Sequence, residues 1–332
     1  MISVVIPLYN KERHIARTIR SILAQDDPDF ELLVVDDGST DSSAERVRQF
    51  KDPRIRLLQQ GNQGESGARN TGLRHARSDY VAFLDADDHW KPNCLGVFRA
   101  LASRFPEAVV LGAGYVEVLN GKPRRTIIKP AWTDDGLLDY FKTMASGESP
   151  FCASSVCVKR SVALELGGFK VGEAMGADLD MWSRLALAGP IAYTPELVAH
   201  YCRFDGEGAM NNNWRMPSHT LWRTLNEALA SPEPAPRQHS YIRRFLTRKL
   251  IGYMSENLVL RGEAQTAYSH LQPYGQVLRP ARRLQVRAYA NFPAPIVVFV
   301  IRCSRFFRTR CHLLKLVSHR LLAGSASSRS GI

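Results

Sequence analysis

Cysteine is sparse in this sequence, and its spacing excludes two kinds of small scaffold. The six cysteines are scattered, with no C-x-x-C pair and no histidine at a spacing suited to zinc. A zinc finger and a disulfide-rich scaffold are therefore excluded. We expect free thiols and a reducing, cytoplasmic compartment.

Long apolar runs are also missing. The best candidate, Ile296–Ile301, is far shorter than the roughly 20 residues that an α-helix needs to cross a bilayer. The N-terminus leads directly into Ser3-Val4-Val5-Ile6, with no basic segment ahead of an apolar one, so no signal peptide is expected. With 45% hydrophobic and 23% charged residues among 332, the composition is typical of a globular chain with one large domain or two smaller ones.

Acidic residues are missing from the end of the chain. After Glu263 there is no Asp or Glu but there are eleven Lys and Arg, so most of the net charge of +12 lies in this tail. Residues 296–322 place Phe307, Cys311 and Leu314 at helical spacing, with Arg side chains largely elsewhere. The pattern predicts a basic amphipathic helix on an anionic membrane surface. The alternative is a helix packed on the body with a solvated basic face.

The first 90 residues alternate between short apolar runs and helical patterns. Expected strands cover Ile2–Ile6, Phe30–Val35, Arg54–Leu58 and an apolar run ending at Asp85. Helical spacing between them predicts βαβ units and an α/β fold with a Rossmann-like, mostly parallel sheet flanked by helices. Three strand ends carry polar residues that would meet at one edge of the sheet and form a nucleotide crevice: Tyr9-Asn10, Asp36-Asp37 and Asp85-Ala86-Asp87.

The acidic turn after the fourth expected strand is the strongest candidate site. Asp85, Asp87 and Asp88 lie within four positions, so their carboxylates repel one another and favour a bound cation. Mg²⁺ and Mn²⁺ prefer oxygen ligands, and Mg²⁺ is usually held by one or two carboxylates plus substrate phosphates. The turn therefore predicts a metal–diphosphate site, with a solvated acidic turn as the alternative. The Gly64 and Gly67 pair matches neither a Rossmann nor a P-loop fingerprint.

Four motifs follow one another in order, and together they resemble the inverting family-2 glycosyltransferases, which have the GT-A fold. They are Tyr9-Asn10, Asp36-Asp37-Gly38-Ser39-Thr40-Asp41, Gly67-Ala68-Arg69-Asn70-Thr71-Gly72 and Asp85-Ala86-Asp87-Asp88. Gly167-Gly168-Phe169 and the segment from Asp178 to Leu185 add a fifth. The resemblance covers about residues 1–205. In its second half, helices are expected over residues 133–144 and 177–188, the latter ended by Gly189-Pro190, and extended segments over residues 152–159 and 191–203. We expect a GT-A domain in residues 1–210, a helical basic region in residues 211–322 and a disordered tail in residues 323–332.

The resemblance implies a role for each matching residue. Asp178 would be the catalytic base, although Ala177 stands where the family usually has Glu. Asp87 would coordinate the metal ion. The donor would be bound by Pro7, Tyr9, Asp37, Arg69, Asp85 and Arg203.

Each of these residues also has an ordinary structural interpretation. Tyr9 would then be a core aromatic, Arg69 a surface ion pair, and Asp178 a helix cap, with Asp88 capping the helix after the acidic turn. Asp180 is interpreted as structural. His200 is left off the site, because a lone histidine at a strand end is more often a hydrogen-bonded structural residue.

The leading hypothesis is a metal-dependent inverting glycosyltransferase using Mg²⁺ or Mn²⁺. It would transfer a hexosyl or N-acetylhexosaminyl group from a nucleotide sugar, most simply a UDP-sugar, to a glycan or lipid-linked glycan. The enzyme would then act in the synthesis of a surface polysaccharide or glycoconjugate, at the cytoplasmic face of the membrane. The alternatives are a sugar nucleotidyltransferase, whose Gly-rich signature residues 7–14 lack, and a non-catalytic glycan- or nucleic-acid-binding protein. No nucleic-acid partner is expected, because the tail has no recognition motif.

Overall fold

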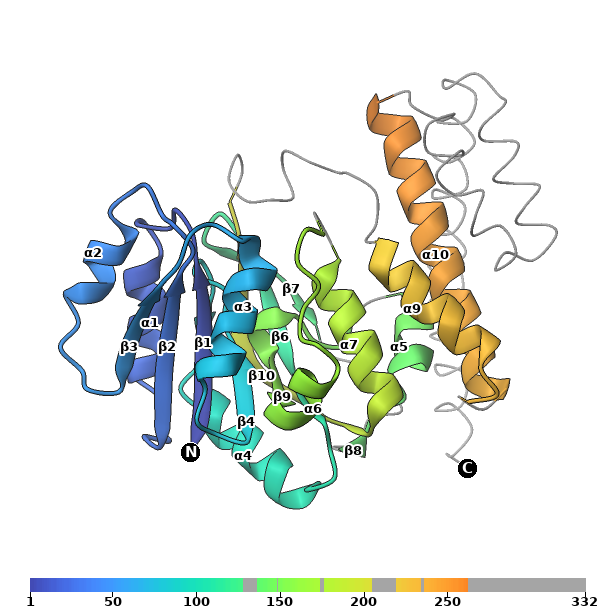
Figure 1. Ribbon diagram of the computed structural model, residues 1–332, viewed down its shortest axis with the longest axis horizontal. Helices are drawn as coiled ribbons and strands as arrows, with labels where there is room; N and C mark the ends of the chain where they lie inside the picture. The colour runs from blue at the N-terminus through green and yellow to red at the C-terminus, as the bar shows by residue number, and fades with distance from the viewer. Residues whose placement is uncertain (128–135, 148, 174–175, 205–218, 234–235, 262–332) are drawn as a thin grey trace, which may run out of the picture. The chain divides into compact units, whose positions relative to one another are not determined.

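A computed structural model of the chain describes residues 1–127, 136–147, 149–173, 176–204, 219–233 and 236–261 (Figure 1). Contacts divide the chain into two compact units, Met1–Arg248 and Lys249–Ile332, and the features below belong to the first. Within the described residues, no helix combines the length and apolar character needed to cross a membrane.

The strands and helices alternate along the first unit. The strands are β1 (Ile2–Leu8), β2 (Phe30–Asp36), β3 (Ile55–Gln59), β4 (Tyr80–Phe83), β5 (His89–Trp90), β6 (Val110–Leu119), β7 (Lys122–Ile127), β8 (Gly136–Leu137), β9 (Val156–Lys159) and β10 (Ile191–Arg203). The helices are α1 (Ile15–Leu23), α2 (Ser43–Arg48), α3 (Gly64–His75), α4 (Cys94–Arg104), α5 (Tyr140–Ser146), the 3₁₀ helix η1 (Ala153–Ser155), α6 (Arg160–Glu165), α7 (Ala177–Ala188), α9 (His219–Ala230) and α10 (Pro236–Arg261), of which α10 continues into the second unit.

A single sheet runs through the unit in the order β3-β2-β1-β4-β9-β6-β10-β5, with β7 beside β6 and β8 beside β10. Strands β3, β2, β1 and β4 are parallel, as the βαβ pattern predicts. Beyond them the sheet is mixed, because β9 runs antiparallel to both neighbours and β7 returns along β6. That return is a tight hairpin at Asn120-Gly121, whose φ values of 48° and 78° fit a type I′ turn. The predicted α/β class is confirmed, and the mostly parallel arrangement holds for the first four strands.

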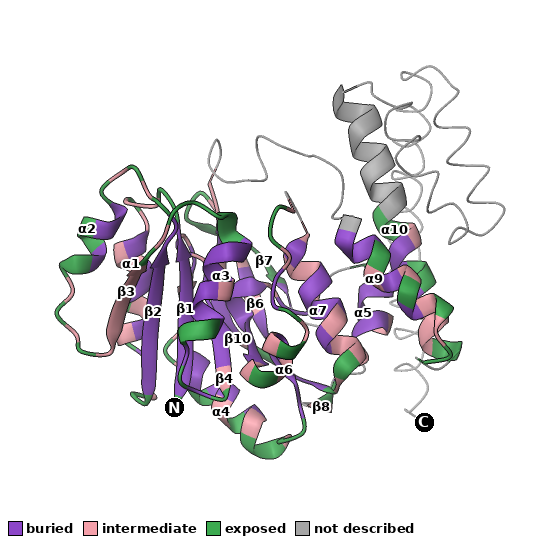
Figure 2. Ribbon diagram, in the orientation of Figure 1, coloured by how far each residue is buried: buried purple, intermediate pink, exposed green. Residues whose placement is uncertain are grey.

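The two faces of β1 pack against different helices. Val4 and Ile6 belong to the core cluster that includes Ile15 and Ile19 of α1. On the other face, α3 approaches β1 so closely that a Cβ on Gly72 would lie 2.2 Å from Val5 Cγ1. Both faces of the sheet centre are therefore buried, as Figure 2 shows, which explains why these strands are apolar without alternation.

Strand β1 continues two residues further than expected, with Pro7 inside it rather than closing it. The carbonyl of Val5 accepts from Leu84 N on the β4 side of the strand. Pro7 lies two residues after Val5 and therefore faces the same neighbouring strand, so its missing N–H is on the β4 side. Strand β4 pairs with β1 only as far as Phe83, and proline therefore costs no ladder bond here.

Other predicted boundaries are partly right. Helix α7 and strand β10 have the predicted limits, whereas β4 ends at Phe83 rather than Asp85. The helix expected over residues 133–144 begins only at Tyr140, because Gly136–Leu137 pairs with β10 as β8. The strand expected from Cys152 begins at Val156, after η1. The predicted domain boundary near residue 210, the helix over residues 296–322 and the tail over residues 323–332 lie outside the described residues.

Candidate active site

The loops after β1 and β2 are fastened to each other. Asn10 has a φ of 51°, a left-handed conformation that asparagine tolerates better than most residues. Its side-chain oxygen accepts from Thr40 N at 2.8 Å, and its own N–H donates to Ser39 Oγ at 3.1 Å. Tyr9 is 46% exposed, so the core-aromatic interpretation is wrong, and its stacking on a nucleotide base stays a prediction. The polar strand ends therefore form one connected edge.

Asp37 is buried at this edge. Its Oδ1 accepts from Gln60 Nε2 at 2.7 Å and from Gln63 N at 2.9 Å. Its neighbour Asp36 is also buried, and accepts from Ser39 N and Gln59 Nε2. These bonds hold Asp37 against the segment that leads into α3. Its recognition of a nucleotide base stays a prediction.

Asp88 ties the acidic turn to two distant elements. Its carboxylate accepts from Ser154 Oγ of η1 at 2.5 Å and from Cys202 N of β10 at 2.7 Å. Ser154 Oγ also accepts from Asp85 N at 3.1 Å, so one hydroxyl contacts both ends of the turn. Burial raises the pKa of Asp88 well above its usual range, and the charges of Asp85 and Asp87 raise it further. The helix-cap interpretation of Asp88 is therefore wrong, because its side chain is used in tertiary contacts.

Helix α1 holds the backbone of the same turn. The Thr18 hydroxyl lies 2.8 Å from Ala86 O and 2.7 Å from Asp88 O, and shares its proton between these carbonyls. Arg17 Nη2 donates to Asp87 O at 2.6 Å. Three successive carbonyls are thus bound, and the carboxylates of Asp85 and Asp87 are left to the site. Thr18 was missed from the sequence, where its only signal is a polar residue on the apolar face of a helix.

Asp85 is paired with Arg69 of α3. Arg69 Nη2 donates to Asp85 Oδ1 at 2.7 Å and also to Glu65, and the Arg69 side chain is only 5% exposed. The surface-pair interpretation of Arg69 is therefore wrong. Burial raises the pKa of Asp85 to about 7; Arg69 opposes this shift, whereas the charges of Glu65 and Asp87 add to it.

Asp178 acts on the same guanidinium from the first turn of α7. Burial lowers the pKa of Arg69, but the carboxylates of Glu65, Asp85 and Asp178 outweigh it and raise that pKa above its ordinary value. Asp178 also adds to the effect of burial in raising the pKa of Tyr140. The charges of the predicted base and of Asp85 therefore both act on the Arg69 guanidinium. The catalytic role of Asp178 itself stays a prediction.

Asp87 faces Lys11 across the edge of the sheet. Lys11 Nζ lies 2.5 Å from Asp87 Oδ2, and the two side chains are 24% and 21% exposed. Within the described ranges, no group of three or more His, Cys, Asp or Glu side chains is arranged to hold a metal ion. Two neighbouring carboxylates, Asp85 and Asp87, fit Mg²⁺ or Mn²⁺ only if substrate phosphates complete the ligand set.

Arg203 does not contact the acidic turn. Its Nη1 lies 3.2 Å from Glu117 Oε1, so the pair joins β10 to β6. Nearby, His200 stacks on His89 with ring centroids 4.5 Å apart. Burial lowers the pKa of both imidazoles, that of His89 to about 4, and nearby positive charge lowers them further. His200 stays outside the candidate site, and the closing of Arg203 over a diphosphate stays a prediction.

A buried ion pair supports the fifth motif. Asp180 accepts from Arg184 Nε at 2.8 Å and from Thr224 Oγ1 at 2.8 Å, and is fully buried. Arg184 then donates to Gly168 O at 2.7 Å. The structural interpretation of Asp180 fits these contacts.

The next residue, Phe169, connects this clamp to the site. Asn70 bonds both the N–H and the carbonyl of Phe169, at 2.7 and 2.8 Å. The Arg69 guanidinium lies over the Phe169 ring, 5.4 Å from its centroid. Phe169 in turn packs edge-on against Phe83 of β4 and Trp182 of α7. The segment from Asp180 to Arg184 therefore positions Arg69 from outside the site.

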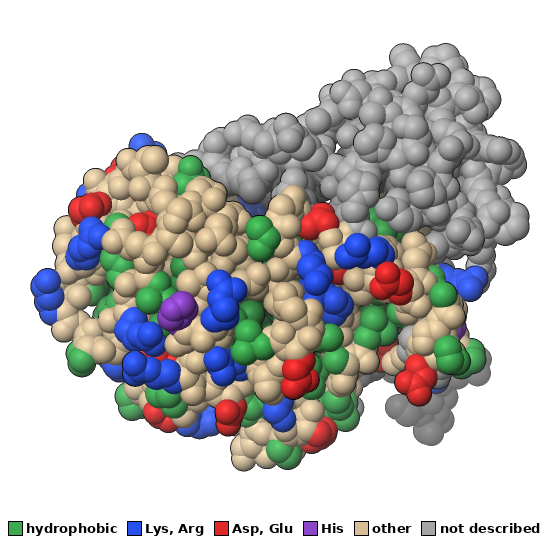
Figure 3. Space-filling model, in the orientation of Figure 1, with side chains coloured by type: hydrophobic (Ala, Val, Ile, Leu, Met, Phe, Trp, Pro, Cys, Tyr) green, Lys and Arg blue, Asp and Glu red, His purple; other side chains and the backbone are tan. Residues whose placement is uncertain are grey.

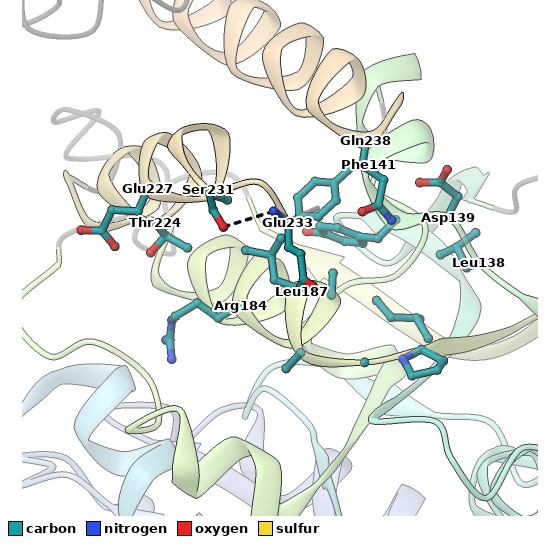
Figure 4. Close-up of a pocket in the computed structure, with 17 residues that line it drawn as sticks. Leu138, Asp139, Phe141, Arg184, Leu187, Thr224, Glu227, Ser231, Glu233 and Gln238 are labelled. Atoms are coloured by element: carbon teal, nitrogen blue, oxygen red, sulfur yellow. Dashed lines mark hydrogen bonds between the residues drawn. The ribbon is translucent and has the colours of Figure 1, made fainter. Parts of the chain in front are cut away.

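A cavity of about 860 Å³ lies elsewhere, between α5, the end of α7 and α9 (Figure 4). Its lining includes Asp139, Arg184 and Glu233, but no residue predicted to bind donor, metal or acceptor. Asp139 caps α5 by accepting from Lys142 N, and Arg184 is engaged as described. The chemistry gathers at the acidic turn, so the turn and not this cavity is the candidate site.

Comparison with known proteins agrees with this geometry. Residues 3–165 match the family model for glycosyl transferase family 2. These residues form a family 2 glycosyltransferase domain. The matched region contains the Tyr9 loop, Asp37, Arg69 and the acidic turn, whereas Asp178 and Arg203 lie beyond it.

Individual relatives cover part of the domain. The chain is 39% identical over 127 residues to an uncharacterized glycosyltransferase, alr2836, of Nostoc sp., covering 37% of this chain and 38% of that protein. It is 44% identical over 96 residues to WfgD of Escherichia coli, a UDP-Glc:α-D-GlcNAc-diphosphoundecaprenol β-1,3-glucosyltransferase, covering 29% and 38%. The matches thus span less than two fifths of these relatives.

The fold itself is shared more widely. A crystal structure of S. aureus TarS in complex with UDP-GlcNAc superposes with a TM-score of 0.73 at 20% identity, covering 91% of this chain and 92% of that one. The predicted GT-A fold is confirmed by this likeness. At such low identity the comparison establishes the fold and nothing of the substrate.

Proposed function

We propose that the chain is an inverting glycosyltransferase that moves a sugar from a nucleotide donor to a hydroxyl group of a glycan or lipid-linked glycan. The observation that carries the proposal is the placing of two acids by cations at one sheet edge. Asp85 pairs with buried Arg69, on which Asp178 also acts, and Asp87, two residues after Asp85, pairs with Lys11. A UDP-sugar is the proposed donor, since UDP-Glc is in the name of WfgD and UDP-GlcNAc is bound to TarS.

Each residue has a distinct task in this proposal. Tyr9 stacks on the nucleobase, whose edge Asp37 binds, and Pro7 fixes the direction in which the Tyr9 loop leaves β1. Asp85 binds the ribose side of the donor and is held in place by Arg69. Arg203 leaves Glu117 to meet the diphosphate. Asp178 accepts the proton of the attacking hydroxyl, because inversion requires a single in-line displacement with the base beside the acceptor.

The metal requirement is part of the same proposal. A bound Mg²⁺ or Mn²⁺ would neutralise charge that develops on the leaving diphosphate. Asp87, assisted by Asp85, would hold it together with donor phosphates. Mn²⁺ is present in a complex of a Pyrobaculum calidifontis mannosyltransferase with GDP-Man that shares the fold at 19% identity and a TM-score of 0.53.

A donor screen tests the proposal. Purified protein is heated with UDP-Glc, UDP-GlcNAc, GDP-Man or ATP, each with Mn²⁺ or with EDTA, and the melting temperature is recorded. We expect a UDP-sugar to raise it only with Mn²⁺, and Asp87→Ala to abolish the increase. Asp79→Ala, which removes an exposed carboxylate near the far end of β4, is the matched control. Equal stabilisation by ATP in EDTA would instead favour a nucleotide-binding protein without transferase activity.

The proposed base is tested separately. Asp178→Asn should keep the donor-dependent increase in melting temperature but lower the rate of sugar transfer by roughly 100-fold or more, the usual contribution of a general base. Full transfer activity in this variant would exclude Asp178 as the base. The anomeric configuration of the product then shows whether transfer proceeds with inversion.

We also propose that the basic tail binds anionic lipid at the cytoplasmic face of a membrane. On the face shown in Figure 3, basic and acidic side chains both occur over the described part of the chain. In the sequence after Glu263, by contrast, Lys and Arg occur without any Asp or Glu. The full chain should sediment with vesicles that contain anionic lipid, and a chain ending at Glu263 should not. Equal sedimentation of both would exclude the tail as the anchor.

A further inference from the structure

Lys11 is placed at Asp87 by several backbone contacts. Its N–H donates to Ser43 Oγ at 2.8 Å, and its carbonyl accepts from the N–H groups of His14 and Ile15, which begin α1. The left-handed residue Asn10 turns the chain just before it. The ammonium therefore reaches Asp87 from a fixed backbone position, and the 2.5 Å contact is built into the loop.

The same contact opposes a divalent ion. Asp87 Oδ2 is the oxygen that Lys11 contacts, and the two side chains are about three quarters buried, where charges interact more strongly than in water. A cation that binds Asp87 must displace the ammonium or remain beside it. A donor diphosphate brings new negative charge, which can accept the displaced ammonium.

We infer that Lys11 is an internal counter-ion that occupies Asp87 in the absence of donor and makes metal uptake depend on the nucleotide. This inference rests on the proposed function, since it requires that Asp87 is a metal ligand. Metal alone binds weakly, because it competes with Lys11. Metal and nucleoside diphosphate bind together more tightly, because the diphosphate gives Lys11 a new partner. By linkage, each then raises the affinity of the other by the same factor.

The experiment measures Mn²⁺ binding by the electron paramagnetic resonance of the free ion, with and without UDP. In the wild type, UDP should tighten Mn²⁺ binding at least tenfold. Lys11→Met should bind Mn²⁺ alone about tenfold more tightly than the wild type, and its gain from UDP should fall by a similar factor. Lys11→Arg keeps the charge and should resemble the wild type. Lys159→Met, remote from the turn and in contact with Pro106 O, is the matched control, and Lys11→Gln is a second uncharged variant.

Unchanged or weaker Mn²⁺ binding by both uncharged variants, or no Mn²⁺ binding by any variant, would overturn the inference. A merely structural salt bridge predicts a lower melting temperature without tighter Mn²⁺ binding, so that result overturns it too. The proposed function is judged by a different readout: turnover of a UDP-sugar in EDTA would keep the transferase while excluding this role of Lys11. Tighter Mn²⁺ binding by Lys11→Met, with no effect of UDP on Mn²⁺ binding by any form of the protein, would overturn the dependence on nucleotide and contradict the proposed donor.

Discussion

Replacing Arg69 with Met should destabilise the fold by about 3 kcal/mol at pH 8. The side chains of Arg69 and Asp85 are 5% and 23% exposed, and removing one partner of a buried pair costs about 3–5 kcal/mol because the other charge stays buried. The lower end applies here, because Asp85 is partly solvated and its pKa is already raised to about 7. Protonation of Asp85 therefore limits the free-energy cost of leaving its carboxylate unpaired. Met fills a similar volume on the Phe169 ring, so packing loss is small.

The dependence of this effect on pH has a definite sign. An acid whose pKa is higher in the folded than in the unfolded protein binds more protons when folded, so stability falls as pH rises between the two values. Without Arg69, the pKa of Asp85 in the folded state rises further, so the decrease in stability with rising pH continues to higher pH. The loss caused by Arg69→Met should therefore be smaller at pH 6 than at pH 8.

Urea unfolding of a double-mutant cycle measures the pair directly. Arg69→Met, Asp85→Asn and the double variant are compared with the wild type at pH 8, with unchanged m-values as the condition for comparison. We expect the double variant to lose about 2 kcal/mol less than the sum of the single variants, since neither charge is then left unpaired. A coupling energy below about 0.5 kcal/mol, the limit for independent sites, would refute the account of Arg69 as the counter-ion that holds Asp85.

Two further predictions concern the supports of the site. Burial lowers the pKa of His89 to about 4, so the unfolded state takes up a proton first as pH falls, and the free energy of unfolding should decline between about pH 6.5 and 4. His89→Gln should flatten this part of a plot of urea midpoint against pH. An unchanged slope would contradict the lowered pKa of His89. Gly168 has a φ of +66°, and a Cβ there would lie 2.4 Å from Asn70 Oδ1, so Gly168→Ala should cost about 2 kcal/mol. Gly96→Ala in α4, with nothing within 4 Å of its Cβ, is the matched control and should be neutral or stabilising; equal losses would refute strain at Gly168.

The strand ends and the acids that follow them could be predicted from the sequence. Unbroken apolar runs specify the buried parallel strands, and polar or acidic residues at the ends of three of these runs mark the edge of the sheet. Helix α7 and strand β10 were predicted with the observed limits, because Gly189-Pro190 separates two apolar patterns without ambiguity. The alternation of strands and helices was enough for the α/β class.

Contacts between distant residues could not be predicted in the same way. Asp88 bonds Ser154 and Cys202, which lie 66 and 114 positions away, and only the register of β10 and η1 in the folded sheet decides which N–H or hydroxyl it meets. The antiparallel position of β9 between β4 and β6 is also a tertiary outcome, because its apolar run fits either direction. For the same reason, the sequence left open whether Arg69 is buried or lies on the surface.

These distant contacts divide the acidic turn into a fixed part and an available part. The carbonyls of the turn are held by α1, and the Asp88 side chain is held by η1 and β10. The side chains of Asp85 and Asp87 instead contact cationic partners, Arg69 and Lys11. An ion pair at a partly solvated edge exchanges partners more easily than a buried backbone hydrogen bond breaks. Folding therefore sets the positions of the two carboxylates in advance, and a bound cation has only to replace one ammonium rather than to order the turn.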